Sequence, residues 1–215
     1  MTLMKINGER FFRRTKQCLT LFAFAFASLQ SASAAAWNHQ FRFDLVRSPA
    51  LNNIPQCVPN ASGEAKIRSI GPVEILDVKV TGLPPKTDFD FFVIQVPNKP
   101  FGMSWYQGDI ETNRNGTGHG TFIGRFSIET FVVAPGTAPA PMTFNNAFPS
   151  ASENPATGPI QMYHLGLWFN SPDDAANAGC PNGVTPFNGE HDAGVQVLNT
   201  SNFPDLQGPL INIQQ

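Results

Sequence analysis

Hydrophobic and polar residues alternate with a period of two along several short segments of this chain. The longest segment runs from residue 121 to 133, where Phe122, Phe126 and Ile128 share one face and Arg125 lies on the other. The same alternation predicts further strands, at residues 41–45, 76–80, 163–169 and near 195–197. Such a pattern is typical of an antiparallel sheet with one buried face.

Residues 88–96 are apolar at nearly every position, so we expect a strand that is covered on both faces. Turn residues at 83–87 and 113–118 separate the expected strands and delimit another at 104–111. One short helix is predicted near 172–178, with Ser171 as its cap, Pro172 in its first turn and Gly179 at its end. Residues 134–159 hold six prolines and little strand signal, which predicts a long surface excursion.

These elements predict an all-β fold. The preferred architecture is an antiparallel β-sandwich with immunoglobulin- or fibronectin-like Greek-key connections and one short helix. A small barrel is the alternative.

The first 36 residues have a different composition. Five basic residues precede an uncharged apolar run at 18–29, and small residues follow up to Ala36. This order is typical of a secretory signal peptide, and the apolar run is shorter than the roughly 20 residues of a membrane-spanning helix. We therefore expect cleavage after Ala36, a single mature domain at residues 37–215, no membrane span after cleavage, and a secreted, periplasmic or cell-envelope location.

Charge and cysteine content change on removal of this segment. The mature chain keeps 9 of the 14 basic and 15 of the 16 acidic residues, a net charge near −6 that makes nucleic acid an unfavourable partner. Only Cys57 and Cys180 remain, each in a loop rich in proline, asparagine and glycine. In an oxidising compartment these two thiols are expected to form a disulfide.

Motifs for catalysis or cofactor binding are absent from the sequence. The G-x-S-x-G elbow of α/β-hydrolases does not occur. The four histidines, which include His164 and His191, lack H-x-H or H-E-x-x-H spacing, so no metal or other cofactor is predicted.

Two groups of residues remain as candidate sites. Glu190, His191 and Asp192 could act with His164 in metal binding or acid–base chemistry if the fold brings them together. The alternative is that residues 190–192 form a polar turn, and that His164 faces solvent or forms structural hydrogen bonds.

The second group contains aromatic residues. Trp105 and Tyr106 could form a platform on which a sugar ring stacks, with Asp109 or Gln107 bonding its hydroxyl groups. The alternative is that these rings pack in the core, because aromatic side chains bury large areas.

The segment VTGLPPKTDFDFFVIQVP at 80–97 resembles the strand–turn–strand unit of fibronectin type III-like sandwiches. PFGMSWYQGDIET at 100–112, GRFSIETFVV at 124–133, YHLGLWFNSP at 163–172 and the segment 185–210 resemble a group of uncharacterised secreted bacterial proteins. This resemblance implies export and a β-sandwich but no particular activity.

The hypothesis that follows is an exported, non-catalytic module for binding, adhesion or envelope association, with an extracellular glycan or protein surface as its ligand. Its contacts are expected around residues 101–109, 134–159 and 186–192. The alternative hypothesis is a secreted hydrolase or metal-dependent enzyme that uses His164 and residues 190–192.

Overall fold

The computed structural model describes residues 40–127, 131–132 and 160–213. The predicted signal peptide at 1–36 and the predicted excursion at 134–159 lie outside the described residues.

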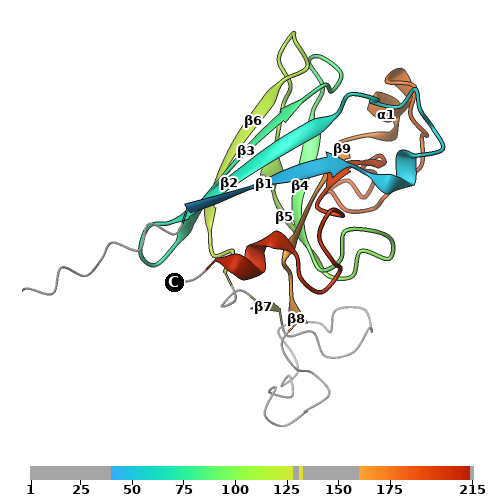
Figure 1. Ribbon diagram of the computed structural model, residues 1–215. Coiled ribbons are helices and arrows are strands. Elements are labelled where there is room, and N and C mark those ends of the chain that lie inside the picture. Colours follow the sequence, from blue (N-terminus) through green and yellow to red (C-terminus); the bar gives the residue numbers. More distant parts are fainter. Residues whose placement is uncertain (1–39, 128–130, 133–159, 214–215) are drawn as a thin grey trace, which may run out of the picture. The chain divides into compact units, whose positions relative to one another are not determined.

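Ten strands and one short α-helix make up the described chain (Figure 1). In chain order the strands are β1 (Gln40–Arg47), β2 (Ser62–Ser69), β3 (Glu74–Thr81), β4 (Phe89–Ile94), β5 (Ser104–Asp109), β6 (Gly118–Gly124), β7 (Phe131–Val132), β8 (Ile160–Gln161), β9 (His164–Phe169) and β10 (Gln196–Asn199). The helix α1 spans Pro172–Asn177, and short 3₁₀ turns lie at Pro49–Leu51 and Pro209–Asn212.

Eight of the strands form one antiparallel sheet in the order β5-β4-β9-β10-β1-β2-β3-β6, while β7 pairs with β8. The sheet has two halves of four strands that meet where β1 pairs with β10. This seam is short, because only Val46 with Asn199 and Arg47 with Leu198 are in register. The all-β prediction is confirmed, and the arrangement as a sandwich stays a prediction.

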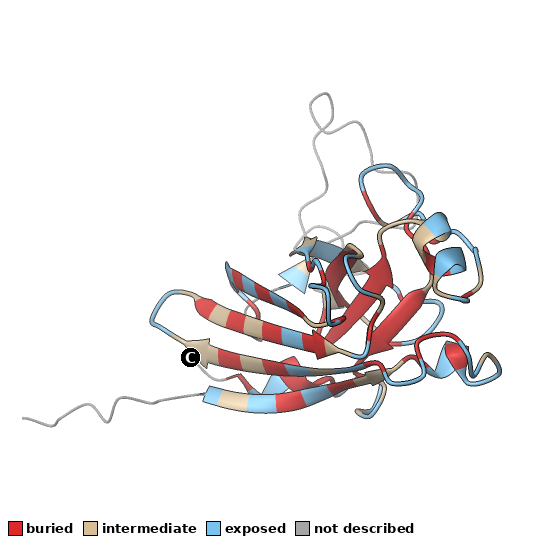
Figure 2. Cartoon of the chain, turned by 90° about the horizontal axis from the view of Figure 1, so that it is seen from above, coloured by how far each residue is buried: buried red, intermediate tan, exposed pale blue. Residues whose placement is uncertain are grey.

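Burial follows the predicted periodicities (Figure 2). Alternate residues of β3 are buried, as its Leu76, Val78 and Val80 require. Every residue of β4 is buried, which confirms the expectation of a strand covered on both faces. Every residue of β9 is buried too, so the prediction that this strand has only one buried face was wrong. Phe89 and Phe91 of β4 enter the main core, whereas Phe92 and Ile94 pack in a second cluster on the opposite face.

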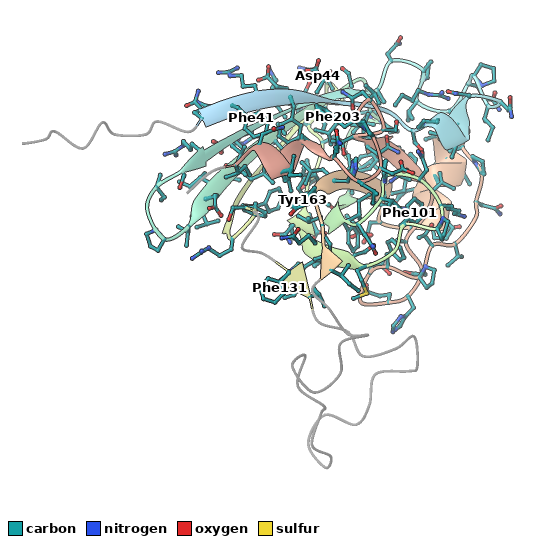
Figure 3. The ribbon with its side chains drawn as sticks, turned by 60° about the horizontal axis from the view of Figure 1, so that its bottom comes forward. Phe41, Asp44, Phe101, Phe131, Tyr163 and Phe203 are labelled. Atoms are coloured by element: carbon teal, nitrogen blue, oxygen red, sulfur yellow. A yellow bond between two sulfur atoms is a disulfide. The ribbon has the colours of Figure 1, made fainter. Side chains whose placement is uncertain are left out.

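The second cluster is aromatic, and it covers the outer face of β4 and β9. Trp168 is fully buried there, with ring centroids 5.3 Å from Phe92, 5.1 Å from Phe101 and 5.4 Å from Phe187. Phe101 comes from the connection between β4 and β5 (Figure 3). Long connections thus provide the apolar cover that a two-sided strand needs.

Two other details of the strand predictions were wrong. The strand expected at 121–133 ends at Gly124, because the backbone N–H of Phe126 donates to the buried Glu74 carboxylate (2.8 Å) instead of continuing the ladder. Strand β2 was missed altogether, although it pairs with both β1 and β3 along its length. Only Ala65 and Ile67 are buried apolar side chains in it, which is too few for a clear alternation.

The predicted covalent link and helix are both confirmed. Cys57 and Cys180 form a disulfide between residues 123 positions apart, with their Cα atoms 4.6 Å from each other. The Ser171 hydroxyl accepts a hydrogen bond from the Asp174 N–H at the start of α1. Gly179 follows the helix at φ +72°, a conformation that glycine adopts without steric cost.

Candidate ligand-binding site

Strands β5 and β6 are consecutive in the chain but belong to opposite ends of the sheet. A tight turn joins them, closed by a bridge between Thr112 and Gly118 and by the Asn113 N–H, which donates to the Thr117 carbonyl (2.9 Å). The Asn113 carboxamide oxygen also accepts from the N–H groups of Asn115 and Thr117. The turn predicted at 113–118 therefore determines the directions in which β5 and β6 diverge.

Glycine keeps the two strands close near this turn. A Cβ atom at Gly118 of β6 would lie 2.7 Å from the side chain of Ile110, which follows β5, and one at Gly108 of β5 would lie 3.1 Å from the Phe122 ring of β6. The rings of Phe91 from β4 and Phe122 from β6 stack at 4.9 Å. These contacts close the space between the two strands at one end.

Strand β5 pairs with β4, and β6 pairs with β3. At the end of β5 and β6 that is far from the turn, a slot of about 360 Å³ opens between these two strands. This volume lies in the range of small-molecule sites. We call it the β5–β6 slot, and it is lined by Val93, Trp105, Gln107, Ile123, Gly124, Arg125, Phe126 and Met162.

Trp105 is the largest side chain of the slot and is 58% exposed. Val93, Phe126 and Met162 are buried and provide an apolar floor, and Gln107 adds a carboxamide group. The Arg125 guanidinium also lines the slot and donates to the Pro72 carbonyl oxygen (2.8 Å). The indole ring thus stands beside polar groups above an apolar surface. The alternative that Trp105 packs in the core is wrong.

Tyr106 does not share this platform. Trp105 is in register with Val93, whereas Tyr106 is in register with Phe92, so their side chains point to opposite faces of β5. The Tyr106 ring packs edge-on against Phe92 at 5.5 Å, and its hydroxyl donates to the Asp109 carboxylate (2.6 Å). Of the residues predicted to bind a sugar, Trp105 and Gln107 line the β5–β6 slot, whereas Tyr106 and Asp109 do not.

Asp109 takes part in a pair of carboxyl groups that sequence reasoning missed. Asp90 of β4 lies directly opposite Asp109 of β5, and only 1% of Asp90 is exposed. Its Oδ2 atom has no hydrogen-bond partner within the described part of the chain. The register of β4 against β5, which brings these carboxyl groups together, cannot be read from either segment alone.

The surroundings of Asp90 favour its neutral form. Burial raises its pKa from 3.8 to about 7, and further contributions come from the negative charges of Asp109 and Asp88, a hydrogen bond with Asp109, and the charge of Glu190. Burial and Asp109 also raise the pKa of Asp88. The neutral, protonated form of Asp90 therefore persists well above the pH at which an exposed aspartate ionises.

His164 is a structural residue. It is fully buried, its Nδ1 lies 2.8 Å from the Thr200 hydroxyl, and its Nε2 lies 3.1 and 3.0 Å from the carbonyl oxygens of Pro204 and Asp205. Because carbonyl groups only accept, Nε2 carries the proton and Nδ1 accepts from Thr200. Burial lowers the pKa of His164, and both ring nitrogens are occupied. The structural hydrogen-bonding alternative is confirmed, and the solvent-facing alternative is wrong.

Residues 190–192 form the polar turn that was the other alternative, and all three side chains are exposed. The Asn188 carboxamide holds this turn by accepting from the N–H groups of Asp192 (2.8 Å) and Ala193 (3.1 Å) and donating to the Asn170 carbonyl (2.9 Å). Asn170 follows the last residue of β9, whereas His164 is its first.

The length of β9 therefore separates His164 from this turn. Five residue steps at about 3.3 Å each correspond to roughly 16 Å, far more than one metal ion can bridge. Among the described residues, no group of three or more histidine, cysteine or carboxylate side chains is arranged to hold a metal ion. The structure does not bring together His164, Glu190, His191 and Asp192.

Comparison of the sequence with models of known protein families finds no match, and neither does comparison with curated proteins. In the described part of the chain, no helix is long and apolar enough to cross a membrane. The functional interpretation therefore depends on the geometry described above.

Proposed function

We propose that the mature chain is an exported, non-catalytic binding module, and that it binds an oligosaccharide in the β5–β6 slot. In this proposal the eight-stranded sheet forms a sandwich of two four-stranded layers, and the slot opens where β5 and β6 separate into different layers. The resemblance to secreted bacterial proteins and the disulfide between Cys57 and Cys180 support export.

The observation that carries the proposal is the exposure of Trp105 beside polar groups. Burying an indole ring is favourable, so a tryptophan that remains 58% exposed at a hollow is a candidate for ligand contact. The apolar face of a pyranose ring can stack on it, and the Gln107 carboxamide can bond a sugar hydroxyl. Catalysis is not part of the proposal, because His164 is occupied by structural hydrogen bonds.

Calorimetry and tryptophan fluorescence can test this site with cellohexaose, N-acetylchitohexaose and maltohexaose as probes. We expect one of these to bind the mature protein and Trp105→Ala to weaken that binding at least about tenfold, which is about 1.4 kcal/mol. Leu206→Ala is the matched control, because Leu206 is a 79% exposed apolar residue outside the slot. An equal loss of affinity in Trp105→Ala and Leu206→Ala contradicts the proposal, and so does the absence of saturable binding of any probe.

A further inference from the structure

A second hollow, independent of the β5–β6 slot, lies against the connection from β4 to β5. It consists of two adjoining parts of about 470 and 590 Å³ that share Lys99, Phe101 and Thr185. We call it the Lys99 groove. Its other lining residues are Pro49, Ala50, Leu51, Ile54, Asn98, Pro100, Gly102, Pro181, Val184, Pro186, Phe187, Val195 and Gln196.

One wall of this groove is held firmly in place. The Arg47 guanidinium donates to the carbonyl oxygens of Leu51 (2.8 Å), Ile54 (2.8 Å) and Cys57 (3.1 and 2.9 Å). The disulfide then joins Cys57 to Cys180, which precedes Pro181, another residue that lines the groove. A wall that is fixed before binding loses little conformational freedom when a ligand arrives.

The polar group at the base of the groove is already satisfied. The Gln196 Oε1 accepts from the Ser48 hydroxyl (3.0 Å) and the Asn199 carboxamide (2.9 Å), and its Nε2 donates to the Pro97 carbonyl (3.2 Å). A ligand therefore gains no hydrogen bond from Gln196. Because most of the remaining lining is proline, alanine, leucine, isoleucine, valine and phenylalanine, the buried part of a ligand must be apolar.

Lys99 is the one charged residue that lines either part of the groove. No carboxylate of the described chain lies within ion-pair distance of its ammonium group. It is also one of only nine basic residues that follow position 36, where acidic residues number 15. A lysine at the rim of an apolar groove, with no ionic partner among the described residues, is complementary to a ligand with one anionic group.

We propose that the Lys99 groove binds an amphiphilic carboxylate, with its hydrocarbon part against the apolar walls and its carboxylate at the Lys99 ammonium. The hydrocarbon supplies most of the affinity and the charge supplies selectivity. Each added methylene group that stays inside the groove is then expected to tighten binding by up to about fourfold.

Calorimetric titration of the mature protein with decanoate, decanol and decyltrimethylammonium tests this assignment. We expect decanoate to bind about three- to fivefold more tightly than decanol, as suits an exposed ion pair, and the cation to bind least. Lys99→Glu should invert the order, so that decyltrimethylammonium binds best. Lys86→Glu is the control, because Lys86 is an exposed lysine in the turn before β4 and has no contact with the groove.

Three results overturn the proposal. The first is absence of saturable decanoate binding, and the second is an unchanged order of affinities in Lys99→Glu. The third is loss of decanoate binding in Trp105→Ala, which would place the fatty chain in the β5–β6 slot instead. Circular dichroism of each variant verifies that a loss of binding is not a loss of folding.

Discussion

Replacing Asp90 by asparagine tests the buried carboxyl pair directly. The carboxamide has nearly the shape of a protonated carboxyl group, can still donate to Asp109, and never carries a charge. The variant therefore mimics the neutral form of Asp90 at every pH.

The sign of the expected effect follows from the raised pKa. Below pH 3.8 both the folded and the unfolded chain hold the proton on Asp90. Between 3.8 and about 7 the unfolded chain loses its proton while the folded chain keeps it, so the stability that this group contributes falls as the pH rises. Above about 7 both states are ionised, and the folded state carries the full cost of a buried charge beside Asp109.

The magnitude follows from the same shift. The pKa difference is about three, and each pKa unit corresponds to about 1.4 kcal/mol, so the contribution of Asp90 to the free energy of unfolding falls by up to about 4 kcal/mol between pH 4 and pH 8. We expect Asp90→Asn to abolish this part of the pH dependence. For each protein, the free energy of unfolding at higher pH is compared with its own value at pH 4. Any pH-independent effect of the amide on stability therefore cancels.

Urea denaturation at pH 4, 6 and 8, followed by far-ultraviolet circular dichroism, measures this difference. Asp44→Asn is the control, because Asp44 is an exposed aspartate at a strand position of β1. An Asp90→Asn protein whose stability changes with pH as much as that of the wild type would refute the reasoning.

Two further predictions concern residues that hold the fold together. Replacing both Cys57 and Cys180 by serine should lower the free energy of unfolding by about 4–5 kcal/mol, because the bridge restricts a loop of more than 100 residues in the unfolded chain. Urea denaturation of this variant measures the decrease, and a decrease below about 1 kcal/mol would contradict the prediction. Burial lowers the pKa of His164, so the free energy of unfolding should decrease as the pH falls below about 6.5. The reason is that the imidazole takes up a proton in the unfolded chain at a higher pH than in the folded chain. The same titration on His164→Gln should lack this component, and an unchanged acid limb would contradict the prediction.

Local sequence patterns were sufficient for most of the fold. The apolar run of β4 and the alternation in β1 and β3 predicted which residues are buried, because each pattern depends only on the strand's own geometry. Strand β2 was missed because its identity comes from its two neighbours, which supply hydrogen bonds to a segment with few apolar side chains.

The candidate sites were harder to predict, for a related reason. Trp105 was recognisable as a candidate from its residue type alone, but the divergence of β5 and β6 that exposes it depends on the long-range order of the sheet. The partnership of Asp90 with Asp109 likewise depends on register across two strands. His164 looked available in the sequence because Thr200 and Asp205, which occupy its ring, are more than 30 residues away.

The position of the disulfide determines what happens when a protease cleaves the chain. Cys57 follows β1 and Cys180 precedes β10, so every connection from β2 to α1 lies inside the covalent ring that the bridge closes. A single peptide-bond cleavage anywhere in that ring opens it without releasing a fragment. A nicked molecule therefore remains one covalent particle, and both four-stranded halves stay joined beside their two-residue seam.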